Sequence, residues 1–336
     1  MLLALDFALL LCSLTGVVLL DAVWAKLLCS LLLGLAIARL FVIGHDACHQ
    51  AFFADRRTNR FLGRIAFLPS LTNYSLWEAG HNVGHHVYTN LRGRDHVWVP
   101  RSKAEYDAMP PWRRALERHY RSGFGYGLYY AVELWWKQLV WPTAEQRARP
   151  NGAYRQDTAL VGVFAAAWIG VLVACAWATA QSAVLLVLLG CVLPFALWNL
   201  VMGTVIYFHH THPHVTWFDD AGLWEANRET CSSTVQITFP FGLGALLNHI
   251  MQHPSHHLEV RVPLYRLNEA QALLATQHSA TIVQPFGLGF AVDCARRCKL
   301  YDYEAQRWTD FDGAFTSAPA SFDASGTPVI EGVAAA

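Results

Sequence analysis

Apolar and polar stretches alternate along the chain. Four apolar runs contain almost no charged residues. Each approaches the length that a helix needs, at about 1.5 Å per residue, to cross the roughly 30 Å hydrocarbon core of a bilayer. Only Gln181 and Ser182 separate the last two runs, which predicts a tight helical hairpin. The pattern therefore predicts an all-α integral membrane protein with four transmembrane helices, at about residues 2–20, 27–43, 158–180 and 183–208.

The first two runs each carry one charge. The run at 2–20 contains Asp6 but has no basic segment before it and no small-residue cleavage site. It is therefore expected to be a retained span and not a signal peptide. Arg39 lies in the last turn of the second run, where its long side chain is expected to extend to the lipid headgroups.

Two further segments are apolar and aromatic but too polar to cross a membrane. Residues 61–77 and 124–141 are interrupted by charged or polar side chains. Aromatic side chains with one polar end favour the membrane–water interface. The segment 61–77 is therefore expected to be an interfacial or partly embedded helix, and 124–141 is expected to be interfacial. In the second segment Glu133 and Lys137 are one helical turn apart and are expected to form an ion pair.

The distribution of lysine and arginine predicts the orientation. Sixteen of the twenty-five basic residues fall in the loop 44–157 and seven follow residue 208, whereas the loops on the opposite side hold one, Lys26. Cytoplasmic loops carry the excess of basic residues. Both termini and the long loop are therefore expected in the cytoplasm, at an inner or plasma membrane.

The composition agrees with a membrane protein. Hydrophobic residues make up 54% of the chain and charged residues 15%, against about 25% in a soluble domain. The formal net charge is zero, so the overall charge does not favour nucleic acid as a partner. Residues 313–336 are rich in Ala, Ser, Gly and Pro, which predicts a disordered tail after a single domain of residues 1–312.

Most of the sixteen histidines fall in four tight clusters. In three of them the histidines are three or four residues apart, which places them on one face of a helix. All four clusters follow predicted span ends on the cytoplasmic side, so a helical cap is expected to carry them there. The clusters are His45 and His49; His81, His85 and His86; His209, His210, His212 and His214; and His253, His256 and His257, with His249 one turn before the last.

Clustered imidazoles indicate a metal site. Neutral imidazole is a good ligand for iron, zinc or copper. One metal takes about four to six ligands, so nine or so convergent histidines indicate two metals in a site made almost entirely of histidine. A lone histidine pair on a helix is more often an ordinary feature. Three clusters on one membrane face are not an ordinary feature, because polar groups beside a bilayer are energetically costly unless they have a function.

Two other classes of histidine-containing membrane protein fit less well. A haem-binding electron carrier would place single histidines in mid-span on facing helices, and the runs 158–180 and 183–208 contain none. A zinc-dependent hydrolase would use a His-Glu-x-x-His helix, which is absent. Neither class accounts for the spacing of the clusters.

The histidine spacing resembles that of the membrane fatty acid desaturase superfamily. The pattern is His45-x₃-His49, then His81-x₃-His85-His86, then His253-x₂-His256-His257, interleaved with four spans over roughly residues 27–270. Such a three-box pattern is highly specific. The segment 209–213, His-His-Thr-His-Pro, is similar to an element of plant oleate desaturases and bacterial acyl-lipid desaturases.

The resemblance implies an oxidoreductase with two non-haem irons that uses O₂ to introduce a double bond into a long acyl chain. It also implies an acyl substrate on lipid, CoA or carrier protein, and a ferredoxin- or cytochrome-type electron donor supplied in trans. Further candidates, either to bind the metal or to support a ligand, are His209, His212 and His249. Asp46 is expected either to accept from a ligand imidazole or to be an ordinary surface cap. The expected ligands are His45, His49, His81, His85, His86, His210, His253, His256 and His257.

The resemblance leaves the reaction open. A hydroxylase, ketolase or acetylenase of the same superfamily would use the same boxes, although the element at 209–213 favours a desaturase over an alkane hydroxylase. Stearoyl-CoA desaturases carry Asn four residues before the extra histidine, where this chain has Ile206, so that feature is absent. Four basic residues after the second box are expected either to contact an anionic headgroup, acyl carrier or redox partner, or to reflect topology alone: Arg92, Arg94, Arg101 and Lys103.

Overall fold

The computed structural model describes residues 1–150, 152–227, 233–277 and 281–320. Within these residues the chain is mostly helical, as predicted. It divides into two compact units. Unit 1 comprises Met1–Gly80 and Tyr130–Gly203, and unit 2 comprises His81–Tyr129 and Thr204–Ala336.

Four helical segments of the described residues are long and apolar enough to cross a membrane, which confirms the predicted number. The second is longer than predicted, because the polar break before it covers only residues 20–22. It extends to Cys48, so His45 lies on the span helix and His49 is its C-cap residue, whereas the prediction placed the first histidine box after the span. The segments are α1 (Leu2–Leu19), α2 (Val23–Cys48), α9 (Ala153–Ala178) and the consecutive α10 (Ala183–Val187), η4 (Leu188–Val192) and α11 (Leu193–His210).

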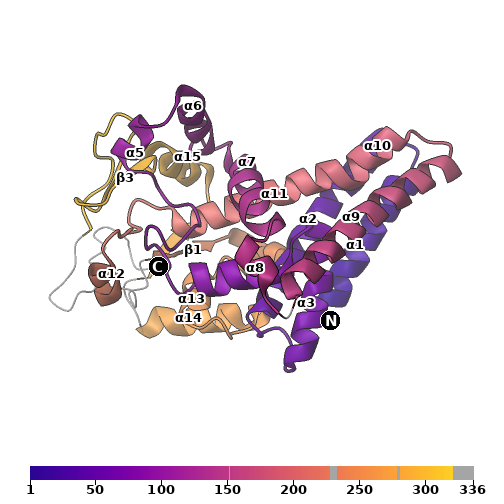
Figure 1. The fold of residues 1–336 in the computed structure, drawn as a ribbon, viewed down its shortest axis with the longest axis horizontal. Helices are drawn as coiled ribbons and strands as arrows, with labels where there is room; N and C mark the ends of the chain where they lie inside the picture. The colour runs from indigo at the N-terminus through magenta and orange to yellow at the C-terminus, as the bar shows by residue number, and fades with distance from the viewer. Residues whose placement is uncertain (151, 228–232, 278–280, 321–336) are drawn as a thin grey trace. The chain divides into compact units, whose positions relative to one another are not determined.

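In unit 1, α1 packs against α2 and α9 against α10, and the long helices run side by side (Figure 1). The last carbonyls of α1 would lack partners in a bilayer, which is costly. Lys26 Nζ donates to the Val17 carbonyl at 2.8 Å, and Gln181 Nε2 donates to the Val18 carbonyl at 2.7 Å. The end of α1 is therefore bound to the start of α2 and to the loop between α9 and α10.

Arg39 does not extend to the headgroups, contrary to the prediction. Its Nε lies 2.6 Å from Asp6 Oδ1, and Asp6 is fully buried. A charge within the apolar part of a membrane protein is costly unless it is paired. The antiparallel packing of α1 and α2 brings the two opposite charges together, which hydropathy along the sequence does not reveal.

The predicted interfacial segment 61–77 is not a single helix. It is divided among α3 (Arg56–Phe67), η1 (Leu68–Ser70) and α4 (Tyr74–Trp77). The chain reverses at Leu71, which has a left-handed φ of 51°. Asp157 at the start of α9 holds this region, because its carboxylate accepts from Arg64 Nε at 2.7 Å and from the Ser75 N–H at 3.0 Å.

The second aromatic segment forms α7 (Tyr126–Tyr129) and the π-helix η3 (Tyr130–Val140). The predicted ion pair is confirmed, since Lys137 Nζ lies 2.6 Å from Glu133 Oε2. A short helix, α8 (Ala144–Ala148), precedes α9.

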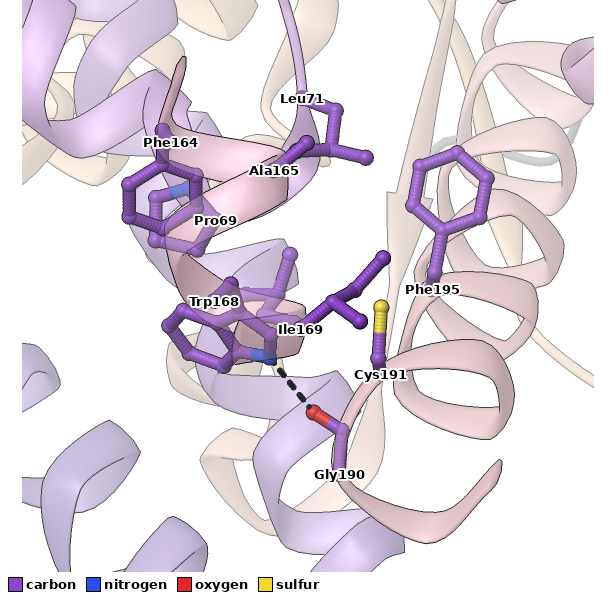
Figure 2. Close-up of a pocket in the computed structure, with 10 residues that line it drawn as sticks. Pro69, Leu71, Phe164, Ala165, Trp168, Ile169, Gly190, Cys191 and Phe195 are labelled. Atoms are coloured by element: carbon purple, nitrogen blue, oxygen red, sulfur yellow. Dashed lines mark hydrogen bonds between the residues drawn. The ribbon is translucent and has the colours of Figure 1, made fainter. Parts of the chain in front are cut away.

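An apolar hollow lies beside α2 in unit 1, lined by residues of η1, α9, η4 and α11 (Figure 2). It measures about 40 Å³, which is on the order of one or two water molecules. The π-helix η4 turns the Gly190 carbonyl towards it, and Trp168 Nε1 donates to that carbonyl at 2.9 Å. The hollow as it stands is therefore too small for a long acyl chain.

The described residues of unit 2 form short helices and two small sheets, which the all-α prediction did not include. β1 (Val235–Thr238) pairs in parallel with β2 (Ile282–Pro285), and β3 (Leu300–Asp302) pairs antiparallel with β4 (Arg307–Thr309). The helices are η2 (Glu78–His85, which begins in unit 1), α5 (Lys103–Asp107), α6 (Pro111–Tyr120), α12 (Ala221–Asn227), η6 (Pro240–Leu247), α13 (His253–Leu258), η7 (Leu264–Arg266), α14 (Leu267–Gln277) and α15 (Leu288–Arg297).

The start of the predicted tail is bound to this unit. The Thr316 N–H donates to the Trp308 carbonyl at 2.9 Å, and Arg297 Nε donates to the Thr316 carbonyl at 2.7 Å. Residues 313–320 therefore extend the packing of β4, whereas the prediction assigned them to a disordered tail. The rest of the predicted tail, 321–336, lies outside the described residues.

Candidate metal centre

The first histidine pair lies at the end of α2 in unit 1. His45 and His49 are both buried, and their ring centroids are 4.8 Å apart, because four residues make about one helical turn. Ala47, between them, faces α3: a Cβ added to Gly63 would lie 2.9 Å from the Ala47 Cβ. Glycine at this position therefore lets α3 pack directly against the histidine-bearing turn.

Four histidines converge in unit 2. They come from three separate segments of the chain: the second box, the end of α11 and the start of α13. One ring nitrogen of each lies within 4.8 Å of the others, although the boxes are far apart in sequence. The four are His85, His210, His253 and His257.

Three further histidines of unit 2 form a second set with the same property. One ring nitrogen each of His81, His86 and His256 lies within 4.8 Å of the other two. His81 and His86 come from the second box, and His256 comes from the face of α13 next to His257. The second and third boxes thus each supply histidines to both sets.

The spacing of the nitrogens fits a metal better than it fits hydrogen bonding. His210 Nε2 and His253 Nε2 are 3.0 Å apart, and so are His81 Nε2 and His86 Nε2. Metal–nitrogen bonds of about 2.1 Å at right angles place two nitrogens about 3 Å apart. Among the described residues, the buried His257 Nε2 has no hydrogen-bond partner. The residues present therefore fit a histidine-bound metal.

The protonation state of the cluster also suits a metal. Burial, with the charges of neighbouring histidines, lowers the pKa of His253 and His257 well below the usual 6.5. The same causes lower the pKa of His256 to about 3. These imidazoles are therefore neutral at physiological pH, the form that binds metal.

Asp95 orients one of the four converging histidines. Its Oδ1 lies 2.9 Å from His85 Nδ1, and the carboxylate is buried. A carboxylate only accepts, so Nδ1 of His85 carries the proton and Nε2 is left with its lone pair. Two backbone N–H groups hold Asp95 in place, those of Val97 at 3.0 Å and Asn90 at 2.9 Å. Asp95 could not be predicted from the sequence, because it lies ten residues after His85 in a loop without periodic pattern.

The further candidates lie outside both sets in the described structure. His209 stacks on His253 with ring centroids 3.7 Å apart, and its Nε2 lies 3.2 Å from Met251 Sδ. His212 Nδ1 accepts from the His214 N–H at 3.2 Å. His249 Nδ1 lies 3.0 Å from Asn268 Nδ2, and Asp46 is buried on α2 in unit 1.

The basic residues after the second box largely face acids. Arg92 Nη2 lies 2.7 Å from Glu105 Oε1, and Lys103 pairs with Asp107 on α5. Arg101 lies 4.0 Å from the same Glu105. Much of this local positive charge is therefore balanced within unit 2.

Comparison with known proteins supplies the family. A model of the fatty acid desaturase family matches residues 22–283. The chloroplastic omega-6 fatty acid desaturase of Brassica napus is 29% identical over 287 residues, which cover 83% of this chain and 60% of the relative. The corresponding Arabidopsis thaliana protein is 30% identical, with 70% and 50% covered.

A cyanobacterial protein is similar over more of its own length. The sn-1 oleoyl-lipid 12-desaturase of Synechocystis sp. is 27% identical over 274 residues, 81% of this chain and 74% of the relative. The chain spans only 50–60% of the length of the plant relatives it matches. The family match nevertheless covers well over half of this chain. The chain therefore belongs to the fatty acid desaturase family.

Proposed function

We propose that this protein is an O₂-dependent membrane desaturase that introduces a double bond into a long acyl chain. The observation that carries the proposal is the convergence of His85, His210, His253 and His257 in unit 2. Family membership and the four apolar helices support it. The relatives are named as omega-6 and oleoyl-lipid desaturases, which favours an acyl group carried on a lipid.

We further propose iron as the metal and two ions as its number. Bound non-haem iron would supply the oxidising power, from O₂, that unactivated C–H bonds require. Residues 1–312 would work as one catalytic domain. The proposed ligands are the two histidines of the first box and the seven that converge in unit 2: His45, His49, His81, His85, His86, His210, His253, His256 and His257.

The chain's own residues perform three tasks in this proposal. Burial keeps the ligand imidazoles neutral, and Asp95 fixes the proton of His85 on Nδ1. The apolar helices give the acyl tail an environment without water, so that the oxidant meets carbon and not solvent. Each buried methylene contributes about 0.8 kcal/mol, so apolar contacts alone can hold a long chain in register.

We propose that the histidine boxes and both termini face the cytoplasm. The excess of basic residues in the loop 44–157 supports this orientation. It gives the site access to a soluble ferredoxin- or cytochrome-type donor, which we propose supplies the electrons in trans.

Lipid analysis tests the proposal directly. Gas chromatography with mass spectrometry of fatty acid methyl esters from an expressing host should show a new unsaturated ester, absent with His49→Ala. Hydroxylated or keto products without alkene would refute the desaturase reaction but not the family chemistry. Oxidised alkanes or carotenoids with unchanged acyl lipids would refute the substrate class. Elemental analysis and Mössbauer spectra of the purified protein should show close to two irons per chain.

A further inference from the structure

A line of aromatic rings leads from the first histidine box to the protein surface, entirely within unit 1. Its members come from α2, α4, α11, η3 and the residue that follows η3, so no single segment of sequence encodes it. Successive ring centroids are separated by 6.1 Å from His45 to Trp77, 4.8 Å to Phe41, 5.4 Å to Trp198, 5.3 Å to Phe195, 4.8 Å to Trp135, 6.1 Å to Trp136 and 5.3 Å to Trp141.

The line is buried at one end and exposed at the other. Trp77 and Trp198 are 6% and 0% exposed, whereas Trp136 and Trp141 are 49% and 56% exposed. Indole is among the most easily oxidised side chains. The phenyl ring of Phe41 lies between the indoles of Trp77 and Trp198, and that of Phe195 lies between Trp198 and Trp135. The line therefore places oxidisable groups at short intervals between a proposed metal ligand and the surface.

Packing alone does not explain the choice of residues. Trp198 Nε1 and Tyr130 Oη, whose rings are 5.4 Å apart, are buried without a hydrogen-bond partner among the described residues. An unpaired buried donor is destabilising, and an aliphatic or phenyl side chain would fill the space without it. Both groups can instead give up an electron, which phenylalanine and leucine cannot.

We propose that this line of rings conducts electrons from the surface to the metal centre when O₂ has been activated and no acyl chain is in place. The inference rests on the proposed function, because it takes His45 as a metal ligand. Its effect is protective: oxidising equivalents leave the buried site before they damage the histidines.

In desaturation O₂ becomes two waters with two electrons from the donor, two protons from solvent, and two electrons and two protons from the acyl chain. Without an acyl chain, the two electrons it would have given pass one at a time from Trp77, which is refilled through Trp198, Trp135 and Trp136. All four protons then come from solvent. The electron vacancy ends at Trp136 or Trp141, whose indole N–H releases its proton to water. A membrane quinol then returns one electron and one proton and becomes a semiquinone.

The line does not serve the ordinary electron donor. Indole gives up an electron only to a strong oxidant. A ferredoxin or cytochrome at low potential cannot oxidise indole, so its electrons cannot move along the line by the oxidation and refilling of successive tryptophans. Conduction is therefore confined to the oxidised centre, and normal turnover does not use it.

Freeze-quench EPR tests the proposal. The purified iron-loaded protein is reduced, mixed with O₂ without acyl substrate, and frozen at intervals, with and without ring-deuterated tryptophan. A radical signal that narrows on deuteration is expected. Peptide mass spectrometry of the same samples should find oxidised indole mainly at Trp136 and Trp141.

Conservative variants decide whether the line carries the electrons. Trp198→Phe should lower the radical and the oxidation at Trp136 and Trp141 several-fold, and move damage to Trp77. Trp168→Phe is the control, because it changes an indole that lies beside the hollow in Figure 2 and outside the line. It should leave the radical and the oxidation at Trp136 and Trp141 unchanged. Trp135→Phe provides a second interruption nearer the surface if Trp198→Phe does not fold.

The outcomes separate the two proposals. Unchanged oxidation in both interrupting variants, or oxidation at Trp136 no greater than at the 80% exposed Trp177, overturns the conducting line. If the same preparation forms alkene, the proposed function stands. A preparation that neither binds iron nor forms alkene overturns both.

Discussion

Asp95→Asn changes the group that orients His85 while keeping its shape. In the native protein the carboxylate accepts from His85 Nδ1 and Val97 N on Oδ1 and from Asn90 N on Oδ2. An asparagine offers one accepting oxygen and one donating amide. If the asparagine oxygen occupies the place of Oδ1, its NH₂ group faces the Asn90 N–H. If the side-chain amide is flipped, its NH₂ group faces both His85 Nδ1 and the Val97 N–H.

The second arrangement has a chemical consequence. The amide would donate to Nδ1 of His85, the proton would move to Nε2, and the nitrogen that faces the metal would lose its lone pair. The first arrangement keeps the tautomer but leaves two buried donors opposed. A lost hydrogen bond to a charged group costs about 1.5–3 kcal/mol, and tenfold in affinity corresponds to about 1.4 kcal/mol. Metal affinity should therefore fall by about tenfold to a hundredfold, in the range typical for groups that orient metal ligands.

The measurement is metal content after challenge with a graded series of chelator concentrations, beside product formation in the expressing host. Asp107→Asn is the matched control, because Asp107 pairs with Lys103 at the surface and is half exposed. An exposed pair contributes about 0–1 kcal/mol, so metal retention should be unchanged. Equal retention in the Asp95 variant and the wild type, or equal loss in both variants, would refute the reasoning.

His257→Ala should lose metal and product, whereas His249→Ala should keep both, since His249 lies outside the two converging sets; elemental analysis of both variants decides. Arg39→Leu removes the ion pair with the buried Asp6 and should lower stability by about 3–5 kcal/mol, seen as a lower melting temperature in detergent, and a further Asp6→Leu change should restore much of it; a melting temperature equal to that of the wild type would contradict the pairing argument. Reporter fusions at Gln181 should indicate the outside of the membrane, and a cytoplasmic signal there would reverse the proposed orientation.

The membrane helices could be predicted because hydropathy is a local property of the sequence. Their pairing could not, and Arg39 shows why: its partner Asp6 is on another helix, so a single apolar run suggests an isolated charge. The sheet of β1 and β2 was missed for the same reason, since these strands pair across more than forty residues of chain. The break at Leu71 also depends on packing, because no glycine marks the left-handed turn.

The histidine boxes could be recognised because each repeats a helical spacing, but the choice within the segment 209–214 needed the structure. Four histidines stand there within six residues, and their spacing does not distinguish them. Helix α11 continues to His210, so His209 and His210 point about 100° apart around its axis. That difference turns His210 towards His253 Nε2 and leaves His209 stacked on the ring of His253 and against Met251. His212 follows the end of the helix and bonds to its own loop. Where a helix ends is set by the contacts of the whole unit, so the spacing of the motif alone does not show that His210 joins the converging set and His209 does not.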